Sequence, residues 1–329
     1  MFFLSLSLSH ISRSITTSTD FSHVMMMIVL ALCRRLTIVD DIRKRLMYYL
    51  IFVVSGSLLA DCAPTFVRVI IPIQTGRGSF LNQWFVKIGW FWTLILLAPF
   101  IYMTSVISKS CQPQSSRSQV RDDSPFLPPN NEKEPFVTTV WNVITDRHLM
   151  RLWLNTLFWY LSTSTFEWLD KKTSSCSMEG FENEESCVLN GHKWLGFDIS
   201  GHTFILLFSL LIIMEECSIM KNWENFGLWL RQEQYDRHRA DKKDLPQHSA
   251  FVKFNLYIRI LFLALTALSM IWHFMLFQTV LFYHTIVQKV IAYFWAVAMW
   301  VIGYKILYTS NYFSSVSRVP NPKSPQRIN

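Results

Sequence analysis

Two histidines beside long apolar stretches are the residues whose types and positions best suit chemistry. His202 closes the triplet Ser200-Gly201-His202, where a polar loop meets the apolar run Ile205–Met214, and His284 follows another long apolar stretch. An imidazole gains and loses protons near neutral pH. One imidazole can attack phosphorus while a second protonates the leaving oxygen. The pair therefore predicts phosphoryl chemistry, whereas a lone histidine at such a boundary is more often a hydrogen-bonded structural residue.

The residues around this pair have types that can bind a phosphate or orient an imidazole. The Ser200 hydroxyl and the N–H groups of a following helix can donate to a phosphate, and Gly201 lets it come close. Asp198, four residues before His202, either orients an imidazole or caps the helix, and capping is favoured. Three lysines can offset negative charge or simply extend to the membrane surface: Lys87, Lys193 and Lys289. Because no cysteine–histidine cluster has zinc spacing, and no glycine-rich phosphate loop is present, neither a metal nor a cofactor is predicted.

The amino-acid composition indicates a membrane protein. Of the 329 residues, 51% are hydrophobic and only 16% are charged, whereas soluble domains carry about 25% charged residues. Several apolar runs approach the ~20 residues that cross a bilayer as a helix. We therefore predict an all-α, polytopic membrane protein. The net charge of +8 is expected to set its topology and not to bind nucleic acid.

Six apolar segments are predicted to form membrane-spanning helices. They are Leu46–Ala60, Trp84–Ile107, His148–Leu169, Ile199–Glu215, Phe254–Tyr283 and Thr285–Tyr308. The segments on one side of these spans, together with both ends of the chain, carry 22 of the 31 Lys and Arg residues, and the two loops on the other side carry 5. Since basic residues are retained in the cytosol, both termini are predicted to be cytosolic. The antiparallel fourth and fifth spans then bring His202 and His284 to the same luminal face.

This topology divides the chain into three parts. Residues 1–45 are predicted to be a poorly ordered cytosolic extension, residues 46–308 the six-helix membrane domain, and residues 309–329 a cytosolic tail. Within the membrane domain, residues 108–147 are rich in Ser, Pro and charge, which is typical of a flexible loop. Residues 170–198 form the larger luminal loop.

The cysteines follow the same division. Cys176 and Cys187 share the larger luminal loop, so they either form a disulfide or remain two thiols. Cys33, Cys111 and Cys217 fall on the cytosolic side and are expected to stay reduced.

Several motifs resemble the fat storage-inducing transmembrane (FIT) family. The most specific is Gly196-Phe197-Asp198-Ile199-Ser200-Gly201-His202-Thr203-Phe204, with Glu215-Glu216 at the end of the same predicted helix. The other similar stretches are Gly56-Ser57-Leu58-Leu59, Trp84-Phe85-Val86-Lys87, Leu157-Phe158-Trp159-Tyr160-Leu161-Ser162-Thr163-Ser164, and Tyr283-His284 followed by Gln288-Lys289-Val290. The resemblance covers roughly residues 45–310 in matching order.

The resemblance implies six spans in the endoplasmic reticulum membrane, a lipid-phosphatase-like helical bundle, and fatty acyl-CoA diphosphatase activity on the luminal side. Acyl-CoA would be cleaved to acyl 4′-phosphopantetheine and adenosine 3′,5′-bisphosphate, in support of lipid-droplet formation and lipid balance. The two family histidines correspond to His202 and His284. By analogy with lipid phosphatases, His284 is the nucleophile and His202 the general acid.

The lipid-phosphatase pattern is met only in part. Ile199 replaces the proline of the Pro-Ser-Gly-His motif. The positions of the phosphate-binding arginine and the histidine-orienting aspartate hold Gln278 and Gln288. The sequence therefore leaves open which group offsets the charge of the diphosphate.

Two other functions fit the same sequence. The first is a non-catalytic protein that holds diacylglycerol or triacylglycerol between its aromatic spans. The second is a transporter, because Arg151, Glu167 and His273 are ionisable residues within predicted spans. Loss of both interfacial histidines should spare the function of a lipid-binding protein, whereas in a transporter His273 should matter more than His284.

Overall fold

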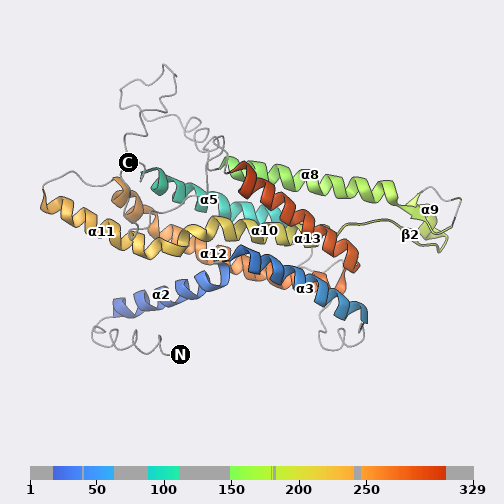
Figure 1. The fold of residues 1–329 in the computed structure, drawn as a ribbon, viewed down its shortest axis with the longest axis horizontal. Coiled ribbons are helices and arrows are strands. Elements are labelled where there is room, and N and C mark those ends of the chain that lie inside the picture. The colour runs from blue at the N-terminus through green and yellow to red at the C-terminus, as the bar shows by residue number, and fades with distance from the viewer. Residues whose placement is uncertain are drawn as a thin grey trace, which may run out of the picture.

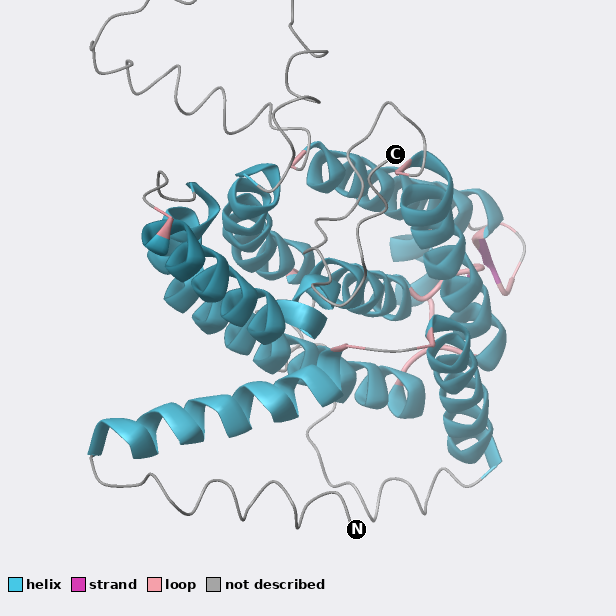
Figure 2. Cartoon of the chain, turned by 60° about the vertical axis from the view of Figure 1, so that its left-hand side comes forward, coloured by secondary structure: helices cyan, strands magenta, loops and turns pink. Residues whose placement is uncertain are grey.

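The computed structural model describes residues 18–38, 41–62, 88–110, 149–178, 180, 183–240 and 246–308. This part of the chain is mostly helical, and the strands within it are two residues long. Figure 1 shows most of the helices running lengthwise beside one another, and Figure 2 shows the same bundle turned. The predicted helical architecture is confirmed.

The long helices, in chain order, are α2 (Ser18–Thr37), α3 (Ile42–Cys62), α5 (Gly89–Ser110), α8 (Met150–Thr173), α10 (Gly201–Cys217), α11 (Trp223–Arg239), α12 (Pro246–Phe282) and α13 (Ile286–Val301). The short elements are β1 (Ser175–Cys176), α9 (Glu184–Leu189), β2 (Trp194–Leu195), the 3₁₀ turn η2 (Ser218–Asn222) and the π-helical η3 (Ile302–Leu307). We call the end of the bundle that carries β1, α9 and β2 the hairpin end; α11 lies at the opposite end (Figure 1).

Helix α10 forms the centre of the bundle. Its sequence is apolar on every side. In the segment Gly201–Arg239, which starts with this helix, 89% of the apolar stretch is buried, as expected for a helix enclosed by protein. It packs against α5, α8, α12 and α13. In helix α3, by contrast, only 17% of the apolar stretch is buried, so this helix lies on the outside of the bundle. The residues that lead into α10 are thereby held at the hairpin end of the core.

Within the described part of the chain, five helical segments are long and apolar enough to cross a membrane: Ile42–Cys62, Gly89–Ile107, Gly201–Arg239, His248–Phe282 and Ile286–Leu307. They overlap five of the six predicted spans. The predicted third span, His148–Leu169, corresponds to α8, which is long enough but is not one of the five. The polar residues Arg151, Asn155, Glu167 and Asp170 lower the hydropathy of that helix.

Part of the N-terminal region is helical, and residues 1–17 lie outside the described residues. Residues 1–45 were expected to be poorly ordered, but Ser18–Thr37 forms α2, which packs against α12 and α10. Leu30 is fully buried in this contact. Arg34 makes an ion pair of 3.0 Å with Glu224 of α11. The apolar run in this region is too short to span a membrane, but it is long enough to pack as a helix along the bundle.

A buried ionic cluster joins three helices inside the bundle. Arg151 of α8 lies 2.9 Å from Glu216 of α10, and both side chains are almost completely buried. The Tyr304 hydroxyl donates to the second carboxylate oxygen of Glu216 at 2.9 Å. The arginine is thus used inside the protein, which leaves it poorly placed to line the path of a transporter.

Removing one partner of this cluster is expected to destabilise the protein strongly. Glu216→Ala leaves the Arg151 charge buried, which costs roughly 3–5 kcal/mol of unfolding free energy. The exposed pair Lys305–Glu215 serves as the matched control, and Lys305→Ala should cost about 1 kcal/mol or less. The measurement is detergent-induced unfolding of the purified variants followed by tryptophan fluorescence. Equal losses for the two variants would contradict the importance of the buried pair.

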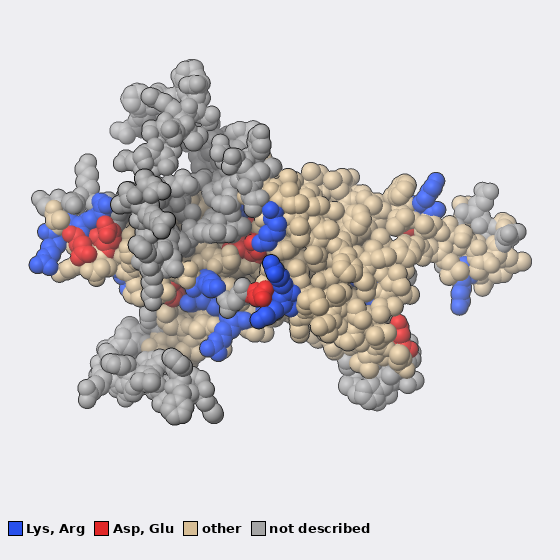
Figure 3. All heavy atoms as spheres, in the orientation of Figure 1, with Lys and Arg blue, Asp and Glu red and all other residues tan. Residues whose placement is uncertain are grey.

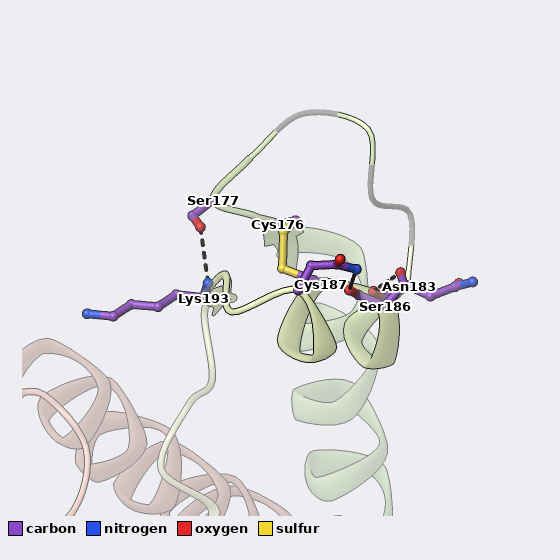
Figure 4. Close-up of a disulfide and its surroundings, with 7 residues drawn as sticks. Cys176, Ser177, Asn183, Ser186, Cys187 and Lys193 are labelled. Atoms are coloured by element: carbon purple, nitrogen blue, oxygen red, sulfur yellow. Dashed lines mark hydrogen bonds between the residues drawn. A yellow bond between two sulfur atoms is a disulfide. The ribbon is translucent and has the colours of Figure 1, made fainter.

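The segment between α8 and α10 is closed by a disulfide. Cys176 and Cys187 are bonded, with a Cα–Cα distance of 5.9 Å (Figure 4). Strands β1 and β2 pair antiparallel, with Ser175 opposite Leu195. Of the two alternatives that the sequence left open, the structure has the paired one. The disulfide ties down the chain that leads into the N-terminus of α10.

Candidate active site

A cavity of about 550 Å³ lies at the hairpin end of the bundle. Its walls come from the last turns of α8, the first turn of α10, and the turn between α12 and α13. The polar and aromatic residues that carry its chemistry are Glu167, Asp170, Asp198, His202, Tyr283 and His284. The size is within the usual range for small-molecule sites.

The two predicted histidines meet in this cavity. The ring centroids of His202 and His284 are 6.3 Å apart, and the planes are tilted by 44°. His202 also stacks on Tyr283, with centroids 6.2 Å apart and planes inclined by 7°. Both imidazoles therefore border one cavity at a short separation. The predicted convergence of the two side chains is observed.

The backbone at His284 has an unusual conformation. Its φ is +56°, and among the described residues it is the single non-glycine residue with a positive φ. Such a conformation costs a side-chain-bearing residue roughly 1–3 kcal/mol and is concentrated at functional sites. Thr285 then starts α13, and its backbone N–H donates to the Gln288 side chain at 2.9 Å as part of a capping box. The turn thereby directs the His284 ring towards α10, and Gln288 serves the cap.

Asp198 lies beside His284. The Asp198 Oδ2 atom is 3.5 Å from His284 Nδ1. The side chain that caps α10 is that of Ser200, whose Oγ accepts the Thr203 N–H at 3.3 Å, so the favoured capping role of Asp198 is wrong. A carboxylate beside one ring nitrogen orients an imidazole and stabilises positive charge that develops on it. Asp198 thus lies within 3.5 Å of the His284 ring, whereas Gln288 serves the cap of α13.

The first turn of α10 supplies backbone to the cavity. Ser200 is buried, and its hydroxyl contacts Thr203 Oγ1 at 2.8 Å, so it holds the helix start instead of lining the cavity. Gly201 lines the cavity, and a Cβ atom there would meet nothing within 4 Å. The space beside Gly201 is therefore open to a phosphate at a helix N-terminus, which is a favourable position for an anion.

The predicted lysines lie elsewhere or outside the described residues. Lys289 is buried, and its Nζ donates to the Val280 carbonyl at 2.7 Å, so it braces the turn between α12 and α13. Lys193 is exposed on the hairpin, where its backbone N–H donates to Ser177 Oγ (Figure 4). Lys87 lies outside the described residues. Neither described lysine lines the cavity.

The α8 wall was missed by the sequence analysis. Thr163, Glu167 and Asp170 line the cavity and recur at the spacing of one helix face. That spacing, at the end of the predicted third span, was the signal that could have located them. With Asp198, three carboxylates face the histidines, and among the described lining residues there is no Lys or Arg. The described part of the cavity can therefore orient and protonate a phosphoryl group, but a cation for its charge is not among these residues.

The bundle and its cavity together define a class: a multi-helix membrane protein in which two histidines and three carboxylates line one cavity. The chain belongs to the fat storage-inducing transmembrane protein family, whose model matches residues 72–304.

Three curated relatives are each named acyl-coenzyme A diphosphatase FITM2. The Drosophila melanogaster protein is 28% identical over 310 residues, covering 90% of this chain and 65% of its own length. The Xenopus laevis protein is 31% identical over 77% of this chain and 78% of its own length. The Homo sapiens protein is 28% identical over 77% of this chain and 78% of its own length. No solved structure matches the chain.

Asp198→Asn is expected to lower the turnover number by roughly 10- to 100-fold, because the imidazole of His284 loses its orienting charge. The Michaelis constant should change little, since Asp198 acts through His284. Asp170→Asn is the matched control, because Asp170 also lines the cavity but its carboxylate accepts from Ser174 Oγ. Steady-state kinetics of both variants check this. An equal fall in turnover for both would contradict a specific role of Asp198.

Proposed function

We propose that this chain is a fatty acyl-CoA diphosphatase, which hydrolyses acyl-CoA to acyl 4′-phosphopantetheine and adenosine 3′,5′-bisphosphate. The observation that carries the proposal is the pair His202 and His284, whose rings face one cavity 6.3 Å apart. The names of the curated relatives identify the substrate class. The reaction needs a nucleophile, a proton donor and water, and takes place next to the membrane that holds the acyl chain.

The reaction divides into two steps at these histidines. A neutral nitrogen of His284 attacks one phosphorus of the diphosphate, and the bond from that phosphorus to the bridging oxygen breaks. His202 gives its proton to the departing oxygen. Water then attacks the phosphorus, the bond from phosphorus to the His284 nitrogen breaks, and His202 takes a proton from that water. Asp198, 3.5 Å from His284, stabilises the positive charge on the His284 ring during both steps.

The proposed architecture has six spans: the five apolar segments and, third in chain order, α8. They are arranged like a lipid phosphatase around the two histidines. Tertiary packing supports α8 in this role, because its buried Arg151 is neutralised by Glu216. The proposed location of the chain is the endoplasmic reticulum membrane, with both termini cytosolic and the cavity luminal. Figure 3 supports this orientation: on this face more basic side chains lie over the left half and centre of the molecule than towards the right-hand end, and the area between them is mainly uncharged.

The proposed orientation predicts which cysteines an impermeant thiol reagent reaches. In sealed, reduced microsomes the reagent should modify Cys111 from the cytosolic side. Cys176 and Cys187 should be spared until detergent opens the vesicles, since the hairpin end would be luminal. Mass spectrometry of the labelled peptides checks this. Labelling of Cys187 in intact vesicles would reverse the topology.

The direct test of the function uses the full chain purified in detergent. With oleoyl-CoA, the wild-type protein should release equal amounts of acyl 4′-phosphopantetheine and adenosine 3′,5′-bisphosphate. The double variant His202→Ala/His284→Ala should release neither. Wild-type protein without product formation, or full activity in the double variant, would overturn the proposal.

The second candidate function is binding of diacylglycerol or triacylglycerol without catalysis. The observation in its favour is the large number of aromatic and aliphatic side chains on the outer faces of the helices, including Phe91, Tyr160 and Phe294. This function predicts that lipid-droplet formation survives the loss of both histidines. Complementation of cells with the double variant separates the two functions.

A further inference from the structure

A second cavity, of about 620 Å³, lies between the start of α3 and the middle of α12. Lys44, Arg45 and Tyr48 line it from α3, and Met270 and His273 line it from α12. His273 precedes His284 by eleven residues, which is about 16 Å along a helix. Helix α3 begins away from the hairpin end and runs towards it (Figure 1). The second cavity is therefore separate from the candidate active site and lies nearer the α11 end.

The polar rim of this cavity is cationic. Arg43, Lys44 and Arg45 are consecutive in the first turn of α3, and that turn contains no acidic residue. Asp41 also lines the cavity, and one of its oxygens accepts the Arg43 backbone N–H at 3.0 Å. Lys44 is exposed and Arg45 half-buried. The lining thus carries two cations against one carboxylate.

His273, which lines the cavity from α12, has both ring nitrogens close to protein groups. Its Nε2 lies 2.9 Å from the Tyr49 hydroxyl, and its Nδ1 lies 2.6 Å from the Ser269 carbonyl oxygen. Both ring nitrogens are therefore engaged within the protein. The charged groups of the cavity that can bind a ligand are therefore Lys44 and Arg45 of α3.

The remaining walls are apolar and reach the outer surface of the bundle. Leu36, Tyr48 and Met270 line the cavity and are each at least half exposed. Two neighbours on the same helices, Ile51 of α3 and Phe274 of α12, are also exposed large hydrophobic residues. In a protein that crosses a bilayer such surfaces face acyl chains. A ligand that fits has an anionic head for the basic rim and an apolar tail along these walls.

We propose that the second cavity binds one anionic phospholipid from the leaflet on the α11 side. The lipid phosphate lies at Lys44 and Arg45, and an acyl chain runs along Tyr48 and Met270. Clusters of basic residues at the edge of a span attract anionic headgroups, and the cavity gives one headgroup a defined position. This site is independent of the diphosphatase activity at the hairpin end.

The test uses the full chain in lipid nanodiscs of phosphatidylcholine that contain a photoactivatable phosphatidic acid. Crosslinked peptides should come from α3 and α12. Lys44→Gln/Arg45→Gln should reduce the crosslinked yield by roughly 30-fold, the combined effect of two interfacial cations. The control Lys171→Gln/Lys172→Gln removes an equally adjacent, exposed pair at the end of α8 and should change nothing.

A charge-neutral pair of variants separates the cavity from general surface attraction. Met270→Trp fills the cavity and should reduce crosslinking, whereas Phe274→Trp, one turn further along α12, should not. Excess inorganic phosphate should leave the wild-type yield unchanged, because the apolar tail contributes to binding. Three results would overturn the proposal: equal labelling by a photoactivatable phosphatidylcholine, full labelling of Met270→Trp, or displacement by inorganic phosphate.

Discussion

Replacing His284 with asparagine is expected to abolish the covalent intermediate and to lower hydrolysis of acyl-CoA by on the order of 10⁴–10⁶-fold. The imidazole nitrogen is the proposed nucleophile, and an amide cannot replace it. Asparagine is the suitable substitute because His284 has a φ of +56°, a conformation that asparagine tolerates better than alanine does. A loss of activity then reports on the missing nucleophile and not on a distorted turn.

The measurement is rapid-quench trapping with acyl-CoA labelled on either side of the diphosphate. The wild-type protein should yield one acid-labile, base-stable adduct, and the side of the molecule that it carries identifies the phosphorus that is attacked. The variant His192→Asn is the control, since His192 lies on the hairpin and outside the cavity lining. An adduct that persists in His284→Asn would refute the assignment of the nucleophile.

Replacing His202 with glutamine is expected to slow hydrolysis of acyl-CoA by roughly 10²–10⁴-fold. The bridging oxygen, which leaves with the phosphate that is not attacked, needs a proton. His202 is the proposed donor. The rate should fall much less for a phosphodiester with a 4-nitrophenolate leaving group, which departs without protonation. The adduct on His284 should still form with that substrate.

The pH dependence gives a second readout for His202. The wild-type rate should be bell-shaped in pH, since one imidazole must be neutral and the other protonated. The group that must be protonated produces the fall at high pH, so His202→Gln should lose that limb and keep the fall at low pH. Tyr283→Phe, which preserves the ring that stacks on His202, should retain both limbs. A profile that stays bell-shaped in His202→Gln would assign the acid to another group, and Glu167 would be the first to examine.

The membrane class and the two histidines could be predicted from the sequence because both depend on local patterns. Apolar runs of membrane length are continuous in the chain, and Ser200-Gly201-His202 lies directly at the border of one of them. Two antiparallel spans that follow each other place the start of the first and the end of the second on the same membrane face. That rule predicted that His202 and His284 lie on one face.

The supporting residues could not be predicted in the same way. Asp198 was assigned to the helix cap because it precedes α10, but Ser200 fills that position and Asp198 lies beside His284. Lys289 was predicted either to offset negative charge or to extend to the membrane surface, but it donates to the Val280 carbonyl of α12 inside the bundle. In both cases more than one role was open to one residue type. Only the placement of neighbouring groups in space decided the role.

The order of α2 was also decided by tertiary packing. The apolar run within it is too short to indicate a span, and most of the stability of a helix in a protein comes from tertiary packing. Burial of Leu30 and the ion pair of Arg34 with Glu224 provide contacts that no local pattern reveals.

The sequence by itself determined that this protein is a helical membrane protein with a pair of histidines at one membrane face, because hydropathy and span direction are properties of continuous segments. The tertiary structure decided which carboxylate meets His284, which polar residues close the cavity, and where the second, basic cavity forms. Those features join residues that are distant in the chain, such as Glu167 with His202 and Lys44 with Met270. Their proximity depends on how the helices pack, and the spacing of residues along one helix does not encode it.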